Sequence, residues 1–213
     1  MIIKPISPKI PTNPDIVDVS AMSFQDEDSL ENCEVSGGAV EEQTAVRLSF
    51  RLSRFNRVVF REVVFEQIDL MDVSFVGCNL ANADFERAVI HRVAFIECNL
   101  MGMNFGSATL RNVVFQNCNL DFSSFRVSDM ENVVFEDCRM RRADMQQSRV
   151  VLSEFRQCSL KEFQMHGTPA RGLDFSTCDI DGLGIRTEEL SGATVSPEQA
   201  VYLARKIGLI VKD

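Results

Sequence analysis

A large apolar residue recurs at every fifth position from Phe50 to Val195. All 30 positions of this series are apolar, and they hold 13 of the 16 phenylalanines. A helix repeats about every 3.6 residues and a strand about every 2, so neither element explains a period of five. A second series, two residues earlier in each pentad, holds mostly small residues such as Val113 and Cys118. Two inward residues at this spacing fit a very short strand followed by a corner.

The cysteines reveal a longer period. Six of the seven recur every 20 residues from Cys78 to Cys178, and phenylalanines such as Phe75 and Phe95 share that spacing. Four pentads per repeat predict a coil with four short sides, in which equivalent residues stack. Stacked strands lie about 4.8 Å apart, so the roughly 7.5 coils of residues 46–195 predict a rod about 36 Å long. Stacking between neighbouring coils is the source of stability in such a rod.

Four pentads show the consensus most clearly: "CNLAN", "ADFER", "CNLMG" and "MNFGS". Each has a small residue, then Asp or Asn, then Leu or Phe, then two variable residues. In this respect residues 46–195 resemble the pentapeptide-repeat proteins. The resemblance implies an all-β fold, a right-handed quadrilateral β-helix. Its handedness and square cross-section come from the resemblance, whereas the stacking period comes from the residues.

The two ends of the chain differ from the repeat region. Residues 196–213 predict a C-terminal capping helix, because Ser196 suits the N-cap, Pro197 the first helical position and Gln199 the capping box. Residues 1–45 carry prolines at 5, 8, 11 and 14 and hold nine acidic residues. They predict an extended or disordered arm followed by an acidic N-terminal cap.

The segment after the predicted helix is short and apolar. A helix followed by such a segment resembles the dimer-forming end of the Qnr and MfpA subfamily of pentapeptide-repeat proteins. We therefore predict a homodimer joined at this end, and a monomeric lid is the alternative. The predicted interface consists of Val201, Leu203, Ala204, Ile207, Leu209, Ile210 and Val211.

Composition and motifs exclude several classes of function. The net charge of −9 disfavours direct binding of nucleic acid. No apolar stretch is long enough to span a membrane, and the N-terminus lacks the pattern of a secretory signal, so we expect a cytoplasmic protein. No nucleotide-binding, zinc-protease or hydrolase motif occurs, and His91 and His166 belong to no triad or metal motif. We therefore expect no enzymatic activity, no cofactor and no metal site.

The cysteine series has a packing explanation. Stacked thiols would point in parallel, which suits neither a disulfide nor a tetrahedral zinc site. We predict that they are small apolar fillers of the interior. Asn79, Asn99 and Asn119 share the 20-residue period, and their stacked amides are expected to hydrogen-bond along the rod.

Two hypotheses for function follow from the resemblance. In the Qnr and MfpA subfamily the rod is taken to imitate duplex DNA and to occupy the DNA-binding saddle of DNA gyrase or topoisomerase IV. A protein-interaction module of this kind needs carboxylates along the rod, although Arg139, Arg141 and Arg142 interrupt them. The alternative is a structural scaffold with an unknown protein partner, which a charge of only −3 over residues 51–213 favours. The candidate acidic residues are Asp69, Asp72, Asp84, Glu86, Glu131, Glu136 and Asp137.

Overall fold

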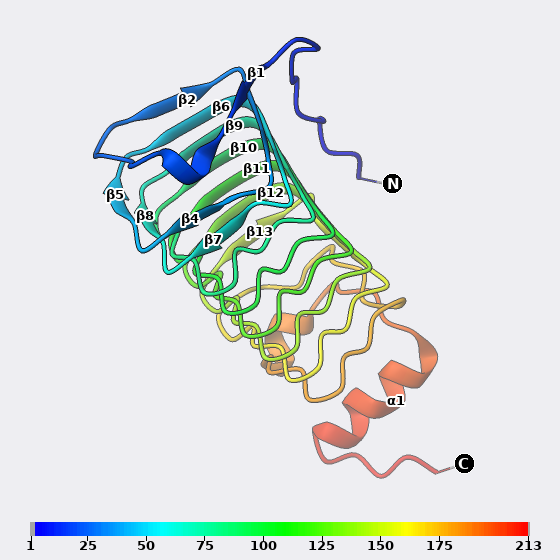
Figure 1. Cartoon of the computed structure of the whole chain (residues 1–213). Helices are drawn as coiled ribbons and strands as arrows, with labels where there is room; N and C mark the ends of the chain where they lie inside the picture. Colours follow the sequence, from blue (N-terminus) through cyan, green and yellow to red (C-terminus); the bar gives the residue numbers. More distant parts are fainter. Residues whose placement is uncertain (1–2, 213) are drawn as a thin grey trace.

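The computed structural model describes residues 3–212. The chain winds into one rod of stacked coils, with an extended N-terminal arm beside it and a short helix at the far end (Figure 1). Residues 20 apart pair in parallel, so that Phe95 lies between Phe75 and Phe115. This arrangement confirms the quadrilateral β-helix that the period of 20 and the family resemblance predicted.

Each coil has four faces separated by four corners. Faces 1 to 4 are centred on the inward residues 50, 55, 60 and 65 and on their equivalents every 20 residues. We call the corner formed by residues 52, 72, 92, 112, 132 and 152 corner 1–2, and name the others in the same way. Corner residues adopt left-handed backbone angles, such as a φ of 56° at Asn112 and 53° at Asn117. Asparagine tolerates this conformation better than most residues.

Long strands cross faces 1 and 2 together. They are β6 (Ser49–Asn56), β9 (Asp69–Val76), β10 (Val89–Ile96), β11 (Thr109–Gln116) and β12 (Asp129–Glu136). Shorter strands occupy the ends of the rod: β1 (Asp15–Val17), β2 (Ser29–Glu31), β3 (Cys33–Ser36), β4 (Ala39–Glu41), β5 (Thr44–Val46), β7 (Val59–Arg61), β8 (Val64–Glu66), β13 (Arg149–Val151) and β14 (Glu154–Arg156). Elsewhere on faces 3 and 4 single bridges replace strands, as between Asn79 and Asn99.

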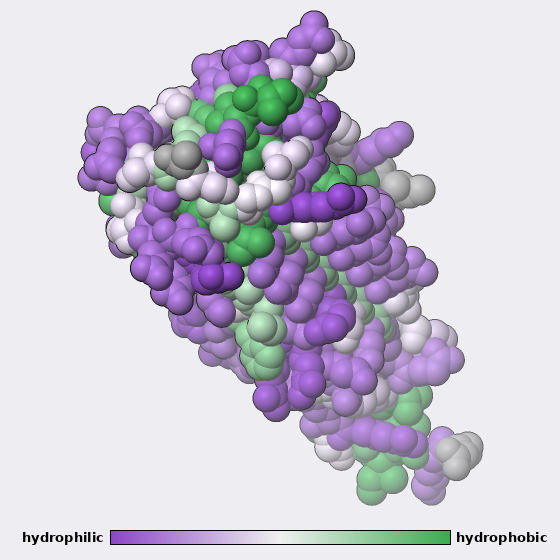
Figure 2. All heavy atoms as spheres, viewed as in Figure 1, coloured by the Kyte–Doolittle hydropathy of each residue, from purple (hydrophilic) through white to green (hydrophobic). Residues whose placement is uncertain are grey.

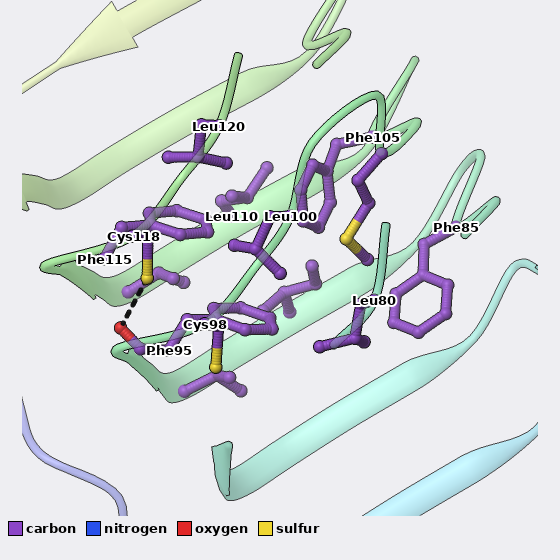
Figure 3. Packing of buried hydrophobic residues seen from close by; sticks show 14 of the residues in the cluster. Leu80, Phe85, Phe95, Cys98, Leu100, Phe105, Leu110, Phe115, Cys118 and Leu120 are labelled. Atoms are coloured by element: carbon purple, nitrogen blue, oxygen red, sulfur yellow. Dashed lines mark hydrogen bonds between the residues drawn. The ribbon is translucent and has the colours of Figure 1, made fainter. Parts of the chain in front are cut away.

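The interior is a column of stacked rings (Figure 3). On face 2 the ring of Phe115 lies parallel to that of Phe95, with centroids 5.0 Å apart and an interplanar angle of 4°. Phe105 reaches across from face 4 and meets Phe115 edge-on at 6.0 Å and 77°. Leu100 and Leu110 fill the other two sides, and all five side chains are fully buried. Large side chains from all four faces therefore fill the interior of the rod.

The cysteine thiols are part of this packing. All seven cysteines are buried and free. The Cys118 thiol donates to the carbonyl of Phe95 at 3.3 Å, one coil away (Figure 3). The Cys98 thiol donates to the Phe75 carbonyl at 3.4 Å in the same way. The prediction that the cysteines are small fillers of the interior is confirmed.

The predicted asparagine series is also present on face 3. The amide of Asn99 donates to the side-chain oxygen of Asn79 at 3.0 Å, and Asn119 donates to Asn99 at 3.2 Å. Each amide therefore connects two successive coils outside the core.

Coiled structure extends N-terminal to residue 46. Strand β2 pairs with β6, and Leu30, Val35, Val40 and Ala45 are buried in the same core. The ring of Phe24 then closes the end of the rod, 5.5 Å from that of Phe50. A 3-10 helix, η1 (Val19–Ala21), leads into this cap.

The C-terminal end is closed by helix α1 (Pro197–Lys206), which follows a 3-10 helix, η2 (Thr187–Leu190). Ser196 Oγ accepts a hydrogen bond from the Gln199 amide at 3.2 Å, and Gln199 Oε1 accepts one from the Ser196 amide at 2.8 Å. The predicted capping box is therefore formed. Gln199 Nε2 also donates to the carbonyl of Phe175 at 2.8 Å, which ties the helix to the last coil.

Replacing a core ring should cost far more stability than replacing an exposed one. We expect Phe115→Ala to lower the free energy of unfolding by about 3–5 kcal/mol, because it leaves a cavity in a stacked column. Phe122, whose ring is half exposed at corner 3–4, is the matched control. Phe122→Ala should change stability by less than about 0.5 kcal/mol. Urea denaturation of both variants measures the difference, and equal losses would contradict this packing.

Candidate protein-interaction surfaces

The predicted acidic residues do not gather on one face. Asp69 and Glu131 lie on face 1, Glu136 on face 2, and Asp84 and Glu86 on face 4. The remaining two occupy corners: Asp72 is at corner 1–2 and Asp137 at corner 2–3. The outward positions of a pentad point in different directions, so acidic residues close in sequence are separated in space.

Most of these carboxylates face an arginine about one coil away. Glu131 lies 3.6 Å from Arg111. Glu136 lies 3.7 Å from Arg156, and Asp69 pairs with Arg51. Exposed pairs of this kind contribute little stability, but they cancel charge locally. Sequence reasoning missed these pairs, although opposite charges 18–20 residues apart were the available signal.

The pair between Asp72 and Arg92 is the most buried of them. Arg92 donates two hydrogen bonds to the Asp72 carboxylate, from Nε at 2.7 Å and from Nη2 at 2.6 Å. The Asp72 side chain is only 5% exposed. Hydrogen bonding to Arg92 lowers the pKa of Asp72 despite the opposing effect of burial, and the backbone amide of Lys9 lowers it further. A carboxylate held in this way stays ionised well below neutral pH.

The basic stretch predicted to interrupt the acidic surface is itself paired. Arg139 contacts Asp121 at 2.6 Å. Arg142 contacts Glu162 at 2.7 Å, and Arg141 lies 3.9 Å from the same carboxylate. The side of the rod is therefore a patchwork of both signs.

Three carboxylates without an arginine lie close together near the N-terminal end, along corner 3–4 and face 4. Among the ion pairs of residues 3–212, none involves Glu62, Glu66 or Asp84. Asp84 instead accepts hydrogen bonds from the Asn104 amide at 3.0 Å and from the Glu86 backbone at 2.9 Å. These three carboxylates form an acidic edge on the side of the rod.

Exposed apolar residues gather at the C-terminal end, where Figure 2 shows hydrophobic side chains beyond the mainly hydrophilic side of the rod. Ile207 is 54% exposed, Leu209 58% and Ile210 90%. Val201 is also exposed, whereas Ala204 and Val211 are half-buried. Leu203 differs from the other predicted interface residues because it packs against the core of its own chain.

Sequence reasoning missed the contacts of the N-terminal arm. The Lys9 amide donates to Asp72 Oδ1 at 2.9 Å, and the Ile6 amide donates to Asn112 Oδ1 at 3.1 Å. The Ile3 amide donates to Glu154 Oε1 at 2.8 Å. The arm therefore lies along corner 1–2, and the regular spacing of its prolines was the available signal.

Comparison with known proteins agrees with this architecture. The sequence profile described as "Pentapeptide repeat region" matches residues 68–133, 88–165 and 110–185, which together cover more than half of the chain. The chain belongs to the pentapeptide-repeat family. No curated protein matches its sequence significantly.

Several solved structures of pentapeptide-repeat proteins are similar in fold. Trypsin-treated QnrB1, a plasmid-mediated fluoroquinolone resistance protein, is 14% identical, with 89% of this chain and 99% of that chain covered and a TM-score of 0.44. Full-length QnrB1 is 15% identical. The match covers 92% of this chain and 95% of that chain, with a TM-score of 0.37. HetL, a pentapeptide-repeat protein involved in heterocyst differentiation regulation in the cyanobacterium Nostoc sp., is 16% identical. The match covers 81% of this chain and 88% of that chain, with a TM-score of 0.36.

Two further findings concern other kinds of site in this pentapeptide-repeat protein. Among residues 3–212, no group of three or more histidine, cysteine or acidic side chains is arranged to hold a metal ion. Within the same residues, no helix has both the length and the apolar composition that a membrane span requires.

The pair between Asp72 and Arg92 predicts a pH-dependent contribution to stability. The folded pKa of Asp72 lies below its unfolded value of about 3.9, so the contribution is present above that value and is lost as pH falls through the folded pKa. At pH 7 we expect Asp72→Asn to lower the free energy of unfolding by about 1.5–3 kcal/mol. The difference from the unmodified chain should shrink below about pH 4.

The exposed corner residue Asp137 provides the control for this effect. Asp137→Asn should change stability by less than about 0.5 kcal/mol at pH 7. Denaturation midpoints measured from pH 2.5 to 7 test both variants. An Asp72→Asn difference that stays constant across this range would show that the ion pair does not contribute.

Proposed function

We propose that this protein is a non-catalytic protein-interaction module that works in the cytoplasm as a homodimer. Its interior is filled by stacked side chains, so contacts with other molecules must use the outside of the rod and its ends. Seven free cysteines are typical of a reducing compartment. The observation that carries the proposal is the long, regular outer surface, on which polar side chains repeat from coil to coil.

The general form of this proposal is a structural scaffold with a protein partner. Pairs such as Glu131 with Arg111 and Arg142 with Glu162 cancel charge along the rod. A surface of mixed sign favours a partner with its own mixed charges over a strongly basic DNA-binding protein. The scaffold is therefore the function that the side of the rod supports best.

A second candidate partner is a type II topoisomerase, either DNA gyrase or topoisomerase IV. The observation that favours it is the edge formed by Glu62, Glu66 and Asp84, whose carboxylates have no arginine partner among the described residues. A narrow rod with such an edge can offer carboxylates where a DNA duplex offers phosphates. This candidate makes the acidic edge, rather than Glu131 or Glu136, the contact surface.

A supercoiling assay distinguishes the two candidates. If the topoisomerase is the partner, micromolar protein will inhibit gyrase supercoiling or alter its response to a quinolone. The triple variant Glu62→Gln, Glu66→Gln and Asp84→Asn should then lose at least about tenfold of that effect, because phosphate mimicry depends on charge. The double variant Glu131→Gln and Glu136→Gln is the matched control and should keep it. If the unmodified protein has no effect on supercoiling, the topoisomerase is rejected as the partner and the scaffold remains as the proposed function.

We place the dimer contact at the C-terminal apolar cluster of Ile207, Leu209 and Ile210. The exposure of these side chains supports this position, because a contiguous apolar surface is typical of an interaction site. Twofold self-association covers such a surface on both copies at once. The polar sides of the rods then remain free for a partner.

Dimerisation is tested by introducing a charge into this cluster. Ile210→Asp should shift the sedimentation mass from that of a dimer to the 24.0 kDa of one chain, because burying an unpaired carboxylate at an interface is costly. Val127, which is 54% exposed on the side of the rod, supplies the control. Val127→Asp should leave the mass unchanged. A dimer that survives both Ile210→Asp and deletion of residues 209–213 would place the contact elsewhere.

A further inference from the structure

The N-terminal arm, residues 3–14, follows corner 1–2 along the outside of the rod (Figure 1). Its prolines stand at every third position, at 5, 8, 11 and 14, and all four are half-buried. The arm amides that donate to the rod, those of Ile3, Ile6 and Lys9, are also three residues apart. Their acceptors lie two coils apart. Three arm residues therefore correspond to two coils of the rod.

These two spacings agree for a physical reason. Proline fixes φ near −65° and favours the polyproline II conformation, which has about three residues per turn and rises about 9.3 Å per turn. Two coils of a β-helix rise about 9.6 Å. Every third amide of such a chain therefore meets every second coil at or beside the same corner.

The rod contacts the main chain of the arm. Three of the hydrogen bonds use arm N–H groups, and in the fourth Arg156 Nη2 donates to the Ile3 carbonyl at 2.6 Å. The side chains of Ile6, Ser7 and Lys9 are exposed. Corner 1–2 therefore selects an extended chain with a particular proline spacing and does not depend on these side chains.

The docking surface continues beyond the described contacts of the arm at one end. A hollow of about 850 Å³ continues past Ile3, with Leu152 in its wall. At the other end the arm bends at residues 12 and 13, and the Asp15 amide then donates to the Asn32 carbonyl at 2.8 Å where β1 begins. The chain's own strand therefore limits the groove at that end.

Charge contributes less to this recognition than the main-chain contacts do. Residues 1–14 contain two lysines and no acidic residue. The carboxylates along the arm, Asp72, Glu131 and Glu154, are each paired with an arginine, namely Arg92, Arg111 and Arg156. The groove therefore recognises the backbone and the proline spacing of its ligand rather than its charge.

We propose that corner 1–2 is a docking groove for an extended, proline-rich segment of a partner protein with proline at every third residue, and that the arm is its competitor within the same chain. The inference rests on the interaction-module function and adds the class of partner. Because the arm is tethered, its effective concentration is high, and a partner segment binds only where the arm has been released.

Peptide binding tests this groove directly. The probe is a fluorescein-labelled peptide with the sequence of residues 3–14, and the protein is the full chain carrying Pro5→Gly and Pro8→Gly, which make the released arm more flexible. We expect the peptide to bind this variant at least about tenfold more tightly than the unmodified chain, because the arm competes less. A peptide of the same composition with adjacent prolines should not bind.

Two asparagines of one coil provide the matched control. Asn112 and Asn117 both occupy left-handed corners, where glycine is tolerated, but only Asn112 contacts the arm. In the arm-weakened chain, Asn112→Gly should reduce peptide affinity about threefold or more, and Asn117→Gly should not change it. The rate of trypsin cleavage after Lys9 reports arm release and should rise with Pro5→Gly and Pro8→Gly.

Release of the arm without saturable peptide binding would overturn the proposal, as would equal binding of the control peptide. Neither result would contradict the interaction-module function, because the supercoiling and sedimentation experiments test other surfaces of the protein. If the protein has no effect on gyrase and its sedimentation mass does not change as expected, the topoisomerase and the dimer contact are rejected. Peptide binding measured in the same protein would still support the groove.

Discussion

The whole molecule depends on the stacking of equivalent residues one coil apart. A ring such as Phe115 has its main neighbours at Phe95 and Phe135, each about one strand spacing away, while main-chain hydrogen bonds join the same coils. Burial of the inward residues supplies the stability, and the parallel register determines which residues meet. A side chain of the wrong size affects two further coils as well as its own, because the interior has no spare volume.

The same register organises the outside of the rod. An outward residue lies beside those 20 positions away, so amides form series and carboxylates find arginines on the adjacent coil. Glu136 near Arg156 and Asp72 with Arg92 are examples. Local pairing of this kind explains how a chain with a net charge of −9 has sides of mixed sign. Function must therefore be assigned to particular edges and ends rather than to total charge.

The N-terminal arm connects these two aspects of the structure. Its amides donate hydrogen bonds to side-chain oxygens of Asp72, Asn112 and Glu154, which belong to alternate coils. Side-chain oxygens at or beside one corner recur at a constant rise, and a chain of matching pitch can follow them. The rod therefore acts as a template whose spacing is set by its own core.

The sequence by itself determined the period, the inward column and the capping box at Ser196, because neighbours in a solenoid stand at constant offsets along the chain. It also determined that the cysteines fill space. Only the tertiary structure decided which outward residues share a face, that Leu203 packs inward, and that the arm docks. The arm contacts join residues 63, 106 and 151 positions apart, and they depend on the pitch of the assembled rod as well as on the proline spacing of the arm.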